Sequence, residues 1–225
     1  MVQRKMRISY NITLLLLVLF QIQFLNAQSI SAKEFVTLSQ KKTLEYKDQS
    51  FSFTLVLNAV GRDGNRIERK NTGTLVMVKQ DGILTLNDQI IFLENNKLIS
   101  VSSEDEEIVV RKIDTSDANF SPSKILNRYS KGTSFKYLEK KKNKKNTLIQ
   151  FIELVPMDTD EVEKVILGIE VDSKKIYSYH EYGLNNVITK VQLDNYKVNM
   201  GIKLEDVKFD INNYPDYDYI APEGM

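Results

Sequence analysis

The sequence predicts a mainly β protein with a few helices (α+β), built around one large antiparallel sheet. β-Branched and aromatic residues gather in short runs separated by Gly, Asn and Asp turn signals. The connections between these runs are shorter than the dozen or so residues that a parallel crossover needs, so neighbouring strands must run antiparallel. Two further segments carry the start signals of helices.

The first residues indicate an export signal. Basic residues at positions 4, 5 and 7 precede an apolar run over residues 12–20, which ends at Gln21. A basic start followed by a short apolar run is typical of a signal peptide, and this run is too short to span a membrane. Ala27 supplies the small residue expected before a cleavage point. We therefore expect residues 1–27 to be a cleaved signal peptide and residues 28–225 to form a single domain.

Two helices are predicted from their ends. Residues 31–34 read Ser-Ala-Lys-Glu, a capping box that satisfies two backbone amides at a helix start, and the helix should run to about residue 46. Ser121 and Pro122 combine an N-cap serine with a proline at the first helical position. Gly132 stands where this second helix should end.

The predicted strands cover residues 51–60, 73–79, 83–86, 89–93, 97–102, 107–113, 135–139, 147–155, 165–171, 174–182, 187–196 and 208–211. Three stretches within them, residues 75–78, 90–93 and 165–167, are apolar on both faces. An antiparallel sheet with one face in water should alternate apolar and polar residues, so both faces must be covered. The two helices suffice for part of one face. Either the sheet closes into a sandwich or barrel, which composition alone favours, or it stays partly open around a bound apolar ligand.

Charge and cysteine content exclude several classes of function. The 31 basic and 30 acidic residues nearly cancel, so the chain has no net field with which to bind nucleic acid. The absence of cysteine excludes disulfides and a lipid-bearing thiol. A basic run at residues 140–145 and an acidic run at residues 104–107 are typical of solvated hairpin tips, with docking to an anionic headgroup or a partner as the alternative.

The sequence lacks the parts of a catalytic site. His180 is the single histidine, and without a cysteine or a second histidine it cannot build an ordinary zinc site, so we interpret it as a solvated strand residue. The chain contains no G-x-S-x-G elbow, no G-x-x-x-x-G-K-[ST] loop and no G-x-G-x-x-G turn. We therefore expect no enzymatic activity, no cofactor and no metal.

Several weak motifs gain weight from their order along the chain. They are the N-terminal helix, Ser-Phe-Ser-Phe at residues 50–53, the strand at 73–79, the short helix from Ser121, Glu-Leu-Val-Pro at 153–156, and Phe-Asp-Ile at 209–211 followed by Tyr214 and Pro215. In this order they resemble the outer-membrane lipoprotein carrier protein family, LolA. The resemblance covers essentially the whole mature chain.

This resemblance implies both a fold and a function. The fold is an unclosed antiparallel β-barrel, or half-barrel, with a helical lid over an apolar concave face. The function is that of a periplasmic carrier that binds the acyl chains of lipoproteins and moves them from the inner to the outer membrane. Its expected partners are acylated lipoproteins, the inner-membrane lipoprotein-releasing ABC transporter and an outer-membrane acceptor. We expect a monomer that works without a cofactor.

The resemblance also implies which residues contact the acyl chains. Matched strand by strand, the ligand face comprises Val76, Val78, Leu84, Leu86, Ile90, Phe92, Ile152 and Tyr179, and the lid comprises Leu38, Ile125 and Leu126. Side chains alternate across a strand, so an error of one residue in this match turns the affected choices onto the opposite face.

The chain departs from the family at one position. LolA proteins that deliver to the outer membrane commonly carry Arg-Pro after the Val-Lys of the second strand, and the arginine bonds to lid carbonyls. Here Lys79 is followed by Gln80 and Asp81. Glutamine can donate to a carbonyl but lacks the charge and the fork of donors of arginine. Three interpretations stay open: a lid that opens more easily, Lys79 acting as the latch, or a divergent member that carries another lipid.

A second class of function is compatible with the same half-barrel. The protein would then be a non-enzymatic envelope signalling or structural module. Its apolar face would bind a protein segment or would be filled by the chain's own side chains.

Overall fold

The computed structural model describes residues 30–61, 64–87, 89–113, 122, 126, 133–157 and 161–222. The chain divides into two compact units, residues 1–31 and 32–225, and the description below concerns the second. The predicted signal peptide, residues 1–27, lies outside the described residues.

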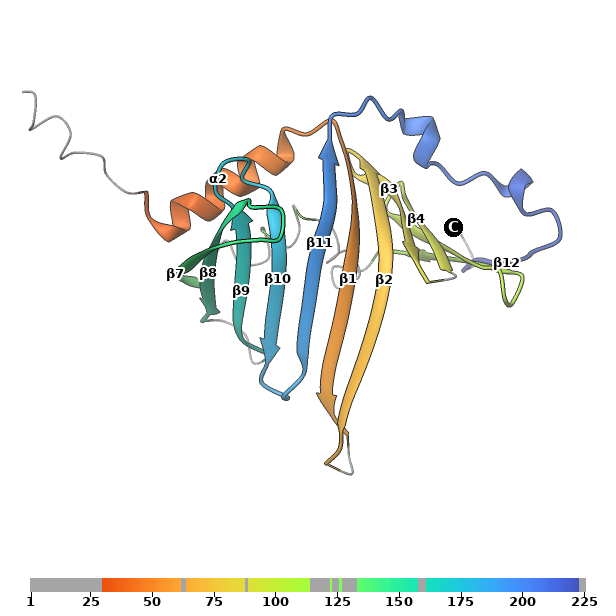
Figure 1. Ribbon diagram of the computed structural model, residues 1–225. Helices are drawn as coiled ribbons and strands as arrows, with labels where there is room; N and C mark the ends of the chain where they lie inside the picture. The colour runs from red at the N-terminus through yellow and green to blue at the C-terminus, as the bar shows by residue number, and fades with distance from the viewer. Residues whose placement is uncertain are drawn as a thin grey trace, which may run out of the picture. The chain divides into compact units, whose positions relative to one another are not determined.

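The described residues form one long helix and one sheet (Figure 1). The helix is α2 (Ala32–Leu44). The strands are β1 (Asp48–Val60), β2 (Arg66–Val78), β3 (Asp81–Leu86), β4 (Gln89–Glu94), β5 (Lys97–Ser102), β6 (Glu107–Lys112), β7 (Thr133–Lys142), β8 (Leu148–Pro156), β9 (Val162–Glu170), β10 (Ile176–Gly183), β11 (Ile188–Val198) and β12 (Asp218–Ile220). Two short 3-10 helices, η1 (Leu204–Val207) and η2 (Ile211–Asn213), lie between β11 and β12.

The sheet is open, as the resemblance implies. Its strand order is β12-β6-β5-β4-β3-β2-β1-β11-β10-β9-β8-β7, so two different strands end it and no pairing closes it. Two meanders, β1 to β6 and β7 to β11, are joined where β1 pairs with β11. The pairs are antiparallel, except that β12 runs parallel to β6. The prediction of an unclosed antiparallel half-barrel is confirmed.

Short turns set which residues share a face. Val78 pairs with Asp81, Leu86 with Gln89, and Glu94 with Lys97, so each of these turns has two residues. Lys79, Asn87, Asn95 and Asn96 have positive φ, the backbone that tight hairpin turns require and that asparagine tolerates well. A two-residue turn joins residues i and i+3. The residues on a given face therefore change from odd to even numbers, or back, at each turn.

The first predicted helix is confirmed within two residues of its expected ends. α2 buries Ala32, Phe35, Val36, Ser39 and Thr43 along one stripe. In the second predicted helix, Pro122 and Leu126 are helical and buried, and the remaining residues, Ile125 included, lie outside the described residues.

The sheet carries apolar clusters on both faces. One of them, which we call the outer cluster, comprises Phe92, Ile99, Val101, Ile108 and Val110, packed by Ile83, Ile90, Phe209, Tyr214 and Tyr217. The aromatic residues of this cluster other than Phe92 come from residues 199–222, which we call the C-terminal segment. The Phe209 ring lies 5.4 Å from the Phe92 ring and stacks on Tyr214 at 5.7 Å. The C-terminal segment therefore covers the second apolar face of β3–β6, for which the sequence offers no amphipathic helix.

One predicted strand is wrong. Residues 208–211 form no strand, because Phe209 packs against Phe92 instead of joining the sheet. The segment pairs with the sheet only further on, at β12, where the Asp218 amide donates to the Glu106 carbonyl at 2.8 Å.

Polar contacts fix the start of this segment. The Asp48 carboxylate, which is buried at the start of β1, accepts hydrogen bonds from the amides of Met200 at 2.7 Å and Gly201 at 2.9 Å. Val207, at the end of η1, is fully buried. The C-terminal segment is thus an integral part of the fold.

Replacing Val207 with alanine tests this packing. Val207→Ala removes two buried methyl groups and leaves a small cavity, so the free energy of unfolding in urea should fall by about 2 kcal/mol. Val60→Ala makes the same change at a side chain that is 52 % exposed and should alter the free energy by less than about 0.5 kcal/mol. Equal effects of the two variants would show that the segment does not pack on the sheet.

Candidate functional site

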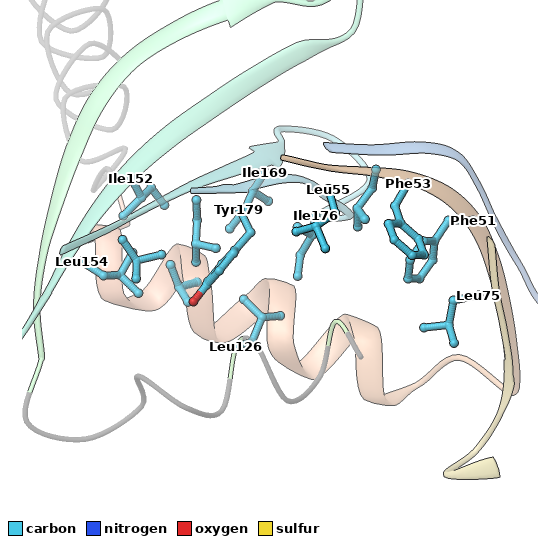
Figure 2. Close-up of a cluster of buried hydrophobic side chains, with 14 of the residues drawn as sticks. Phe51, Phe53, Leu55, Leu75, Leu126, Ile152, Leu154, Ile169, Ile176 and Tyr179 are labelled. Carbon is cyan, nitrogen blue, oxygen red and sulfur yellow. The ribbon is translucent and has the colours of Figure 1, made fainter. Parts of the chain in front are cut away.

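The candidate site is the concave face, which we define as the face of the sheet that packs against α2. Figure 2 shows side chains from β1, β2, β8, β9 and β10 converging on the helix from the arch of strands. The buried members of this cluster are Ala32, Phe35, Val36, Phe51, Phe53, Leu55, Leu75, Met77, Leu84, Leu126, Ile152, Leu154, Val162, Val165, Leu167, Ile169, Ile176, Tyr179 and Leu193. We call it the concave cluster.

The strands supply far more of this cluster than its described cover does. Among its buried residues, fifteen come from strands, three from α2, and Leu126 from the segment between β6 and β7. The helix contributes one large ring, that of Phe35, whose centroid lies 6.3 Å from that of Tyr137 on β7 in an edge-to-face arrangement. Among the described residues, the cover of this broad apolar sheet face is therefore narrow.

Packing is tight at one side of the concave cluster and looser at the other. Ile152, Val165, Leu167 and Ile169, on β8 and β9, have no exposed surface. Leu86 on β3, and Ile91 and Leu93 on β4, are only half-buried, although they pack against the same cluster. The side chains of Leu86, Ile91 and Leu93 are therefore partly accessible to solvent while α2 covers the concave face.

Gly73 shapes the middle of this face. A Cβ atom added there would lie 2.6 Å from the Phe53 ring and 2.3 Å from the Thr85 carbonyl oxygen. The missing side chain makes room for the Phe53 ring to lie across β2. The strand pattern of Phe51, Phe53 and Leu55, with polar residues between them, is the sequence signal for this part of the site.

A polar hollow of about 450 Å³ lies over β1 to β3. It is lined by Ser52, Phe53, Thr54, Thr72, Gly73, Thr74, Thr85 and Asn87. These side chains offer hydroxyl and amide hydrogen bonds but no titratable group. The hollow therefore has no acid or base with which to catalyse a proton transfer.

The structure divides the predicted ligand face between two sides of the sheet. Leu84, Leu86, Ile152 and Tyr179 belong to the concave cluster, and so does Leu126 of the predicted lid. Val76, Val78, Ile90 and Phe92 lie on the opposite face, where Ile90 and Phe92 are part of the outer cluster. The prediction of one shared face is therefore wrong for these four. The concave residues of β2 and β4 are Leu75, Met77, Ile91 and Leu93, because the two-residue turns reverse the numbering.

Leu38, which we expect to line the lid, lies outside the buried stripe of α2. Its side chain is 43 % exposed, whereas the neighbouring Ser39 is fully buried. The buried stripe of α2 runs through positions 32, 35, 36, 39 and 43 and leaves position 38 outside it.

The predicted latch residues occupy a surface turn. Lys79 and Gln80 are the two residues between β2 and β3, and both are exposed. Neither side chain makes a hydrogen bond with the part of the chain that the structure describes.

The described residues contain no group of three His, Asp or Glu side chains placed to hold a metal ion. None of the helices among them is long and apolar enough to cross a membrane. At the concave cluster the Tyr179 hydroxyl donates to the Glu181 carboxylate on the same strand, and the hydroxyl of Tyr196, which packs against the cluster, donates to Gln49 Oε1 at 2.6 Å.

Comparisons with known proteins concern the fold. No family model matches the chain, and no curated protein matches its sequence. An uncharacterized conserved protein from Thermus thermophilus is similar in structure, with a TM-score of 0.53 and 5 % identity over 85 % of this chain and 100 % of that one. This likeness extends along the whole of the Thermus chain and shows a shared fold.

Two more distant neighbours carry descriptive names. A LolA superfamily protein from Nitrosomonas europaea has a TM-score of 0.42 and 9 % identity over 81 % of this chain and 99 % of that one. A complex of MucA and MucB from Pseudomonas aeruginosa has a TM-score of 0.41 and 7 % identity over 80 % of this chain and 61 % of that one.

His180 lies on β10, on the face opposite the concave cluster, paired with Ile166 and Lys190 of the neighbouring strands. The sequence suggests a solvated residue, but His180 is half-buried. Burial lowers the pKa of His180 below its ordinary value, and the nearby Lys190 ammonium lowers it further. Folding therefore favours the neutral imidazole.

The shift of His180 predicts a mildly acid-sensitive fold. Its folded-state pKa is below the unfolded value of about 6.5, so its contribution is fully present above pH 6.5. That contribution is lost as pH falls from 6.5 to the folded pKa, because the unfolded state binds the proton more strongly. The free energy of unfolding should fall more steeply over this range in the wild type than in His180→Gln. Proton NMR of the single histidine should give a pKa below 6.5, and a value above it would contradict the assignment.

Proposed function

We propose that the protein is a periplasmic carrier that binds the acyl chains of lipoproteins on its concave face and moves them from the inner to the outer membrane. It receives them from the inner-membrane lipoprotein-releasing ABC transporter and hands them to an outer-membrane acceptor. Export follows from the N-terminal signal peptide, residues 1–27. No cofactor enters this cycle, and affinity alone drives it.

The observation that carries this proposal is the mismatch between the concave face and its described cover. Fifteen buried residues from strands face three from α2 and Leu126. Burial of one methylene group is worth about 0.8 kcal/mol, so an acyl chain that replaces the helix on this face recovers the free energy of covering it. The half-buried Leu86, Ile91 and Leu93 offer the place of first contact.

The LolA resemblance supports the same assignment. The half-barrel with a helix over its apolar face is the arrangement that the resemblance implies, and it gives that face a use. In this carrier the cargo contacts Leu84, Leu86, Leu126, Ile152 and Tyr179, as expected from the sequence. It also contacts Leu75, Met77, Ile91 and Leu93, which take the place of Val76, Val78, Ile90 and Phe92 in the expected ligand face.

One observation favours the second candidate, a non-enzymatic envelope module. Ile152, Val165, Leu167 and Ile169 are fully buried by the chain's own side chains, which is what a permanently filled interior would show. In that case the accessible apolar edge near β4 would bind a protein segment. Mass spectrometry of what the native protein co-purifies with separates the two functions: acylated proteins support the carrier, and a defined non-acylated polypeptide supports the module.

Two adjacent isoleucines give a matched test of the carrier. Ile90 and Ile91 are both half-buried, but Ile91 packs on the concave cluster and Ile90 on the outer cluster. Ile91→Ser should weaken binding of a fluorescent fatty acid to delipidated protein by about tenfold or more, because it removes apolar contact from the ligand face. Ile90→Ser should leave the Kd within about twofold of the wild type.

Fluorescence titration measures both variants, and urea unfolding checks that they lose similar stability. Saturable binding that weakens equally in both variants would place the probe elsewhere. Absence of saturable binding to the folded wild type would refute the carrier.

A further inference from the structure

A buried serine joins α2 to the turn between β9 and β10. Ser39 has no exposed surface, and its hydroxyl donates a hydrogen bond of 2.6 Å to the carbonyl oxygen of Lys174, which is 135 residues away in the sequence. Lys174 lies in the turn between β9 and β10. The helix, whose Ala32, Phe35 and Val36 pack on the concave cluster, is therefore also held at a defined place by a directional bond.

The β9–β10 turn is built to present that carbonyl. Lys174 has a φ of 62°, and its amide donates to the Glu170 carbonyl at 3.1 Å, while the Glu170 amide donates to the Lys175 carbonyl at 2.9 Å. The Ser173 hydroxyl donates to the Glu170 carboxylate. These bonds lie within the turn and do not involve α2, so the position of the Lys174 carbonyl does not depend on the helix.

The side chain of Lys174 adds a second contact with the same helix. Its ammonium lies 4.4 Å from the centroid of the Phe35 ring and donates to the Val171 carbonyl. A cation over an aromatic face is attractive, and Phe35 is the largest side chain that α2 places in the concave cluster. Lys174 thus contacts α2 twice, one turn of helix apart.

The geometry points to a latch. We propose that Ser39 and Lys174 are positioning residues that hold α2 closed over the concave face and that their separation opens it. Lifting of α2 would regulate access to the concave face, and this role rests on the proposed carrier function. The family resemblance leaves open a latch at Lys79 or Gln80, on the β2–β3 turn. The structure assigns it to the β9–β10 turn.

The strength of this contact suits a reversible lid. When α2 lifts, water replaces each partner of the Ser39–Lys174 bond, so the bond biases the closed state by only about fivefold. A bias of this size keeps the empty protein closed, while an acyl chain can reverse it. The apolar contacts of Ala32, Phe35 and Val36 add to the closing free energy.

Spin labels can measure the opening directly, because the chain has no native cysteine to interfere. Labels on Leu38→Cys, on the exposed side of α2, and Glu163→Cys, exposed on β9, report the distance between helix and sheet. In ligand-free protein, Ser39→Ala should increase the ratio of long to short distances by about fivefold. An unchanged distance distribution in folded Ser39→Ala would overturn the latch.

Two further variants separate the latch from a general loss of stability. Thr43→Val removes another buried hydroxyl of α2, but that hydroxyl donates to the Ser39 carbonyl within the helix, so the distance distribution should not change. Lys174→Asn keeps a residue type that tolerates positive φ, and thus the acceptor carbonyl, but removes the ammonium from the Phe35 ring. It should shift the distribution in the same direction as Ser39→Ala and by less. If Thr43→Val opens the helix as much as Ser39→Ala does, the latch is wrong.

The test is independent of the proposed cargo. Distances are measured without ligand, and the association rate of a fluorescent fatty acid is measured separately on the same variants. Opening of Ser39→Ala without any probe binding to any variant supports the latch and refutes the carrier. Probe binding to the wild type, with the distances and association rate unchanged in Ser39→Ala, supports the carrier and refutes the latch.

Discussion

Desolvation of apolar side chains on both faces of the same strands is the constraint on which this fold depends. On β4, Phe92 faces the outer cluster and Ile91 the concave cluster, so neither face can be left to water. The chain meets this requirement with two unlike covers. Phe209, Tyr214 and the rest of the C-terminal segment are fixed onto one face, and α2 lies over the other.

The strands themselves could be predicted from the sequence, but the face that each residue occupies was only partly predicted. Leu84 and Leu86 lie on the concave face, as expected, while Val76 and Ile90 lie on the opposite face. The faces of adjacent strands are coupled by their turns, and a match of each strand by itself ignores this coupling. A two-residue turn places Leu75 opposite Leu84 and Leu84 opposite Ile91. Turn length, which is readable in the sequence, therefore contained the missing information.

Other features could not be predicted because they depend on distant partners. Apolarity favours Leu38 over Ser39 as the buried residue of α2, yet Ser39 is buried because the Lys174 carbonyl lies within hydrogen-bond distance of its hydroxyl. Likewise, Phe209 lies in a run that is typical of a strand, but the Phe92 ring fixes it outside the sheet. In both cases a contact across more than a hundred residues overrides the local pattern.

The proposed carrier function requires an acyl chain to compete with α2 for the concave face, and the magnitudes of burial allow this. Full burial of a valine or phenylalanine side chain is worth roughly 1.5 to 3 kcal/mol, so the three apolar residues of α2 contribute about 5 kcal/mol to closing the lid. An acyl chain of roughly 16 carbons, at about 0.8 kcal/mol per methylene, can bury apolar surface worth about twice that. In the proposed carrier, a lipid chain could therefore displace the helix, whereas water could not. Release in that cycle would require an acceptor that shields the chain as well as the concave face does, because α2 would cover this face again at a lower gain.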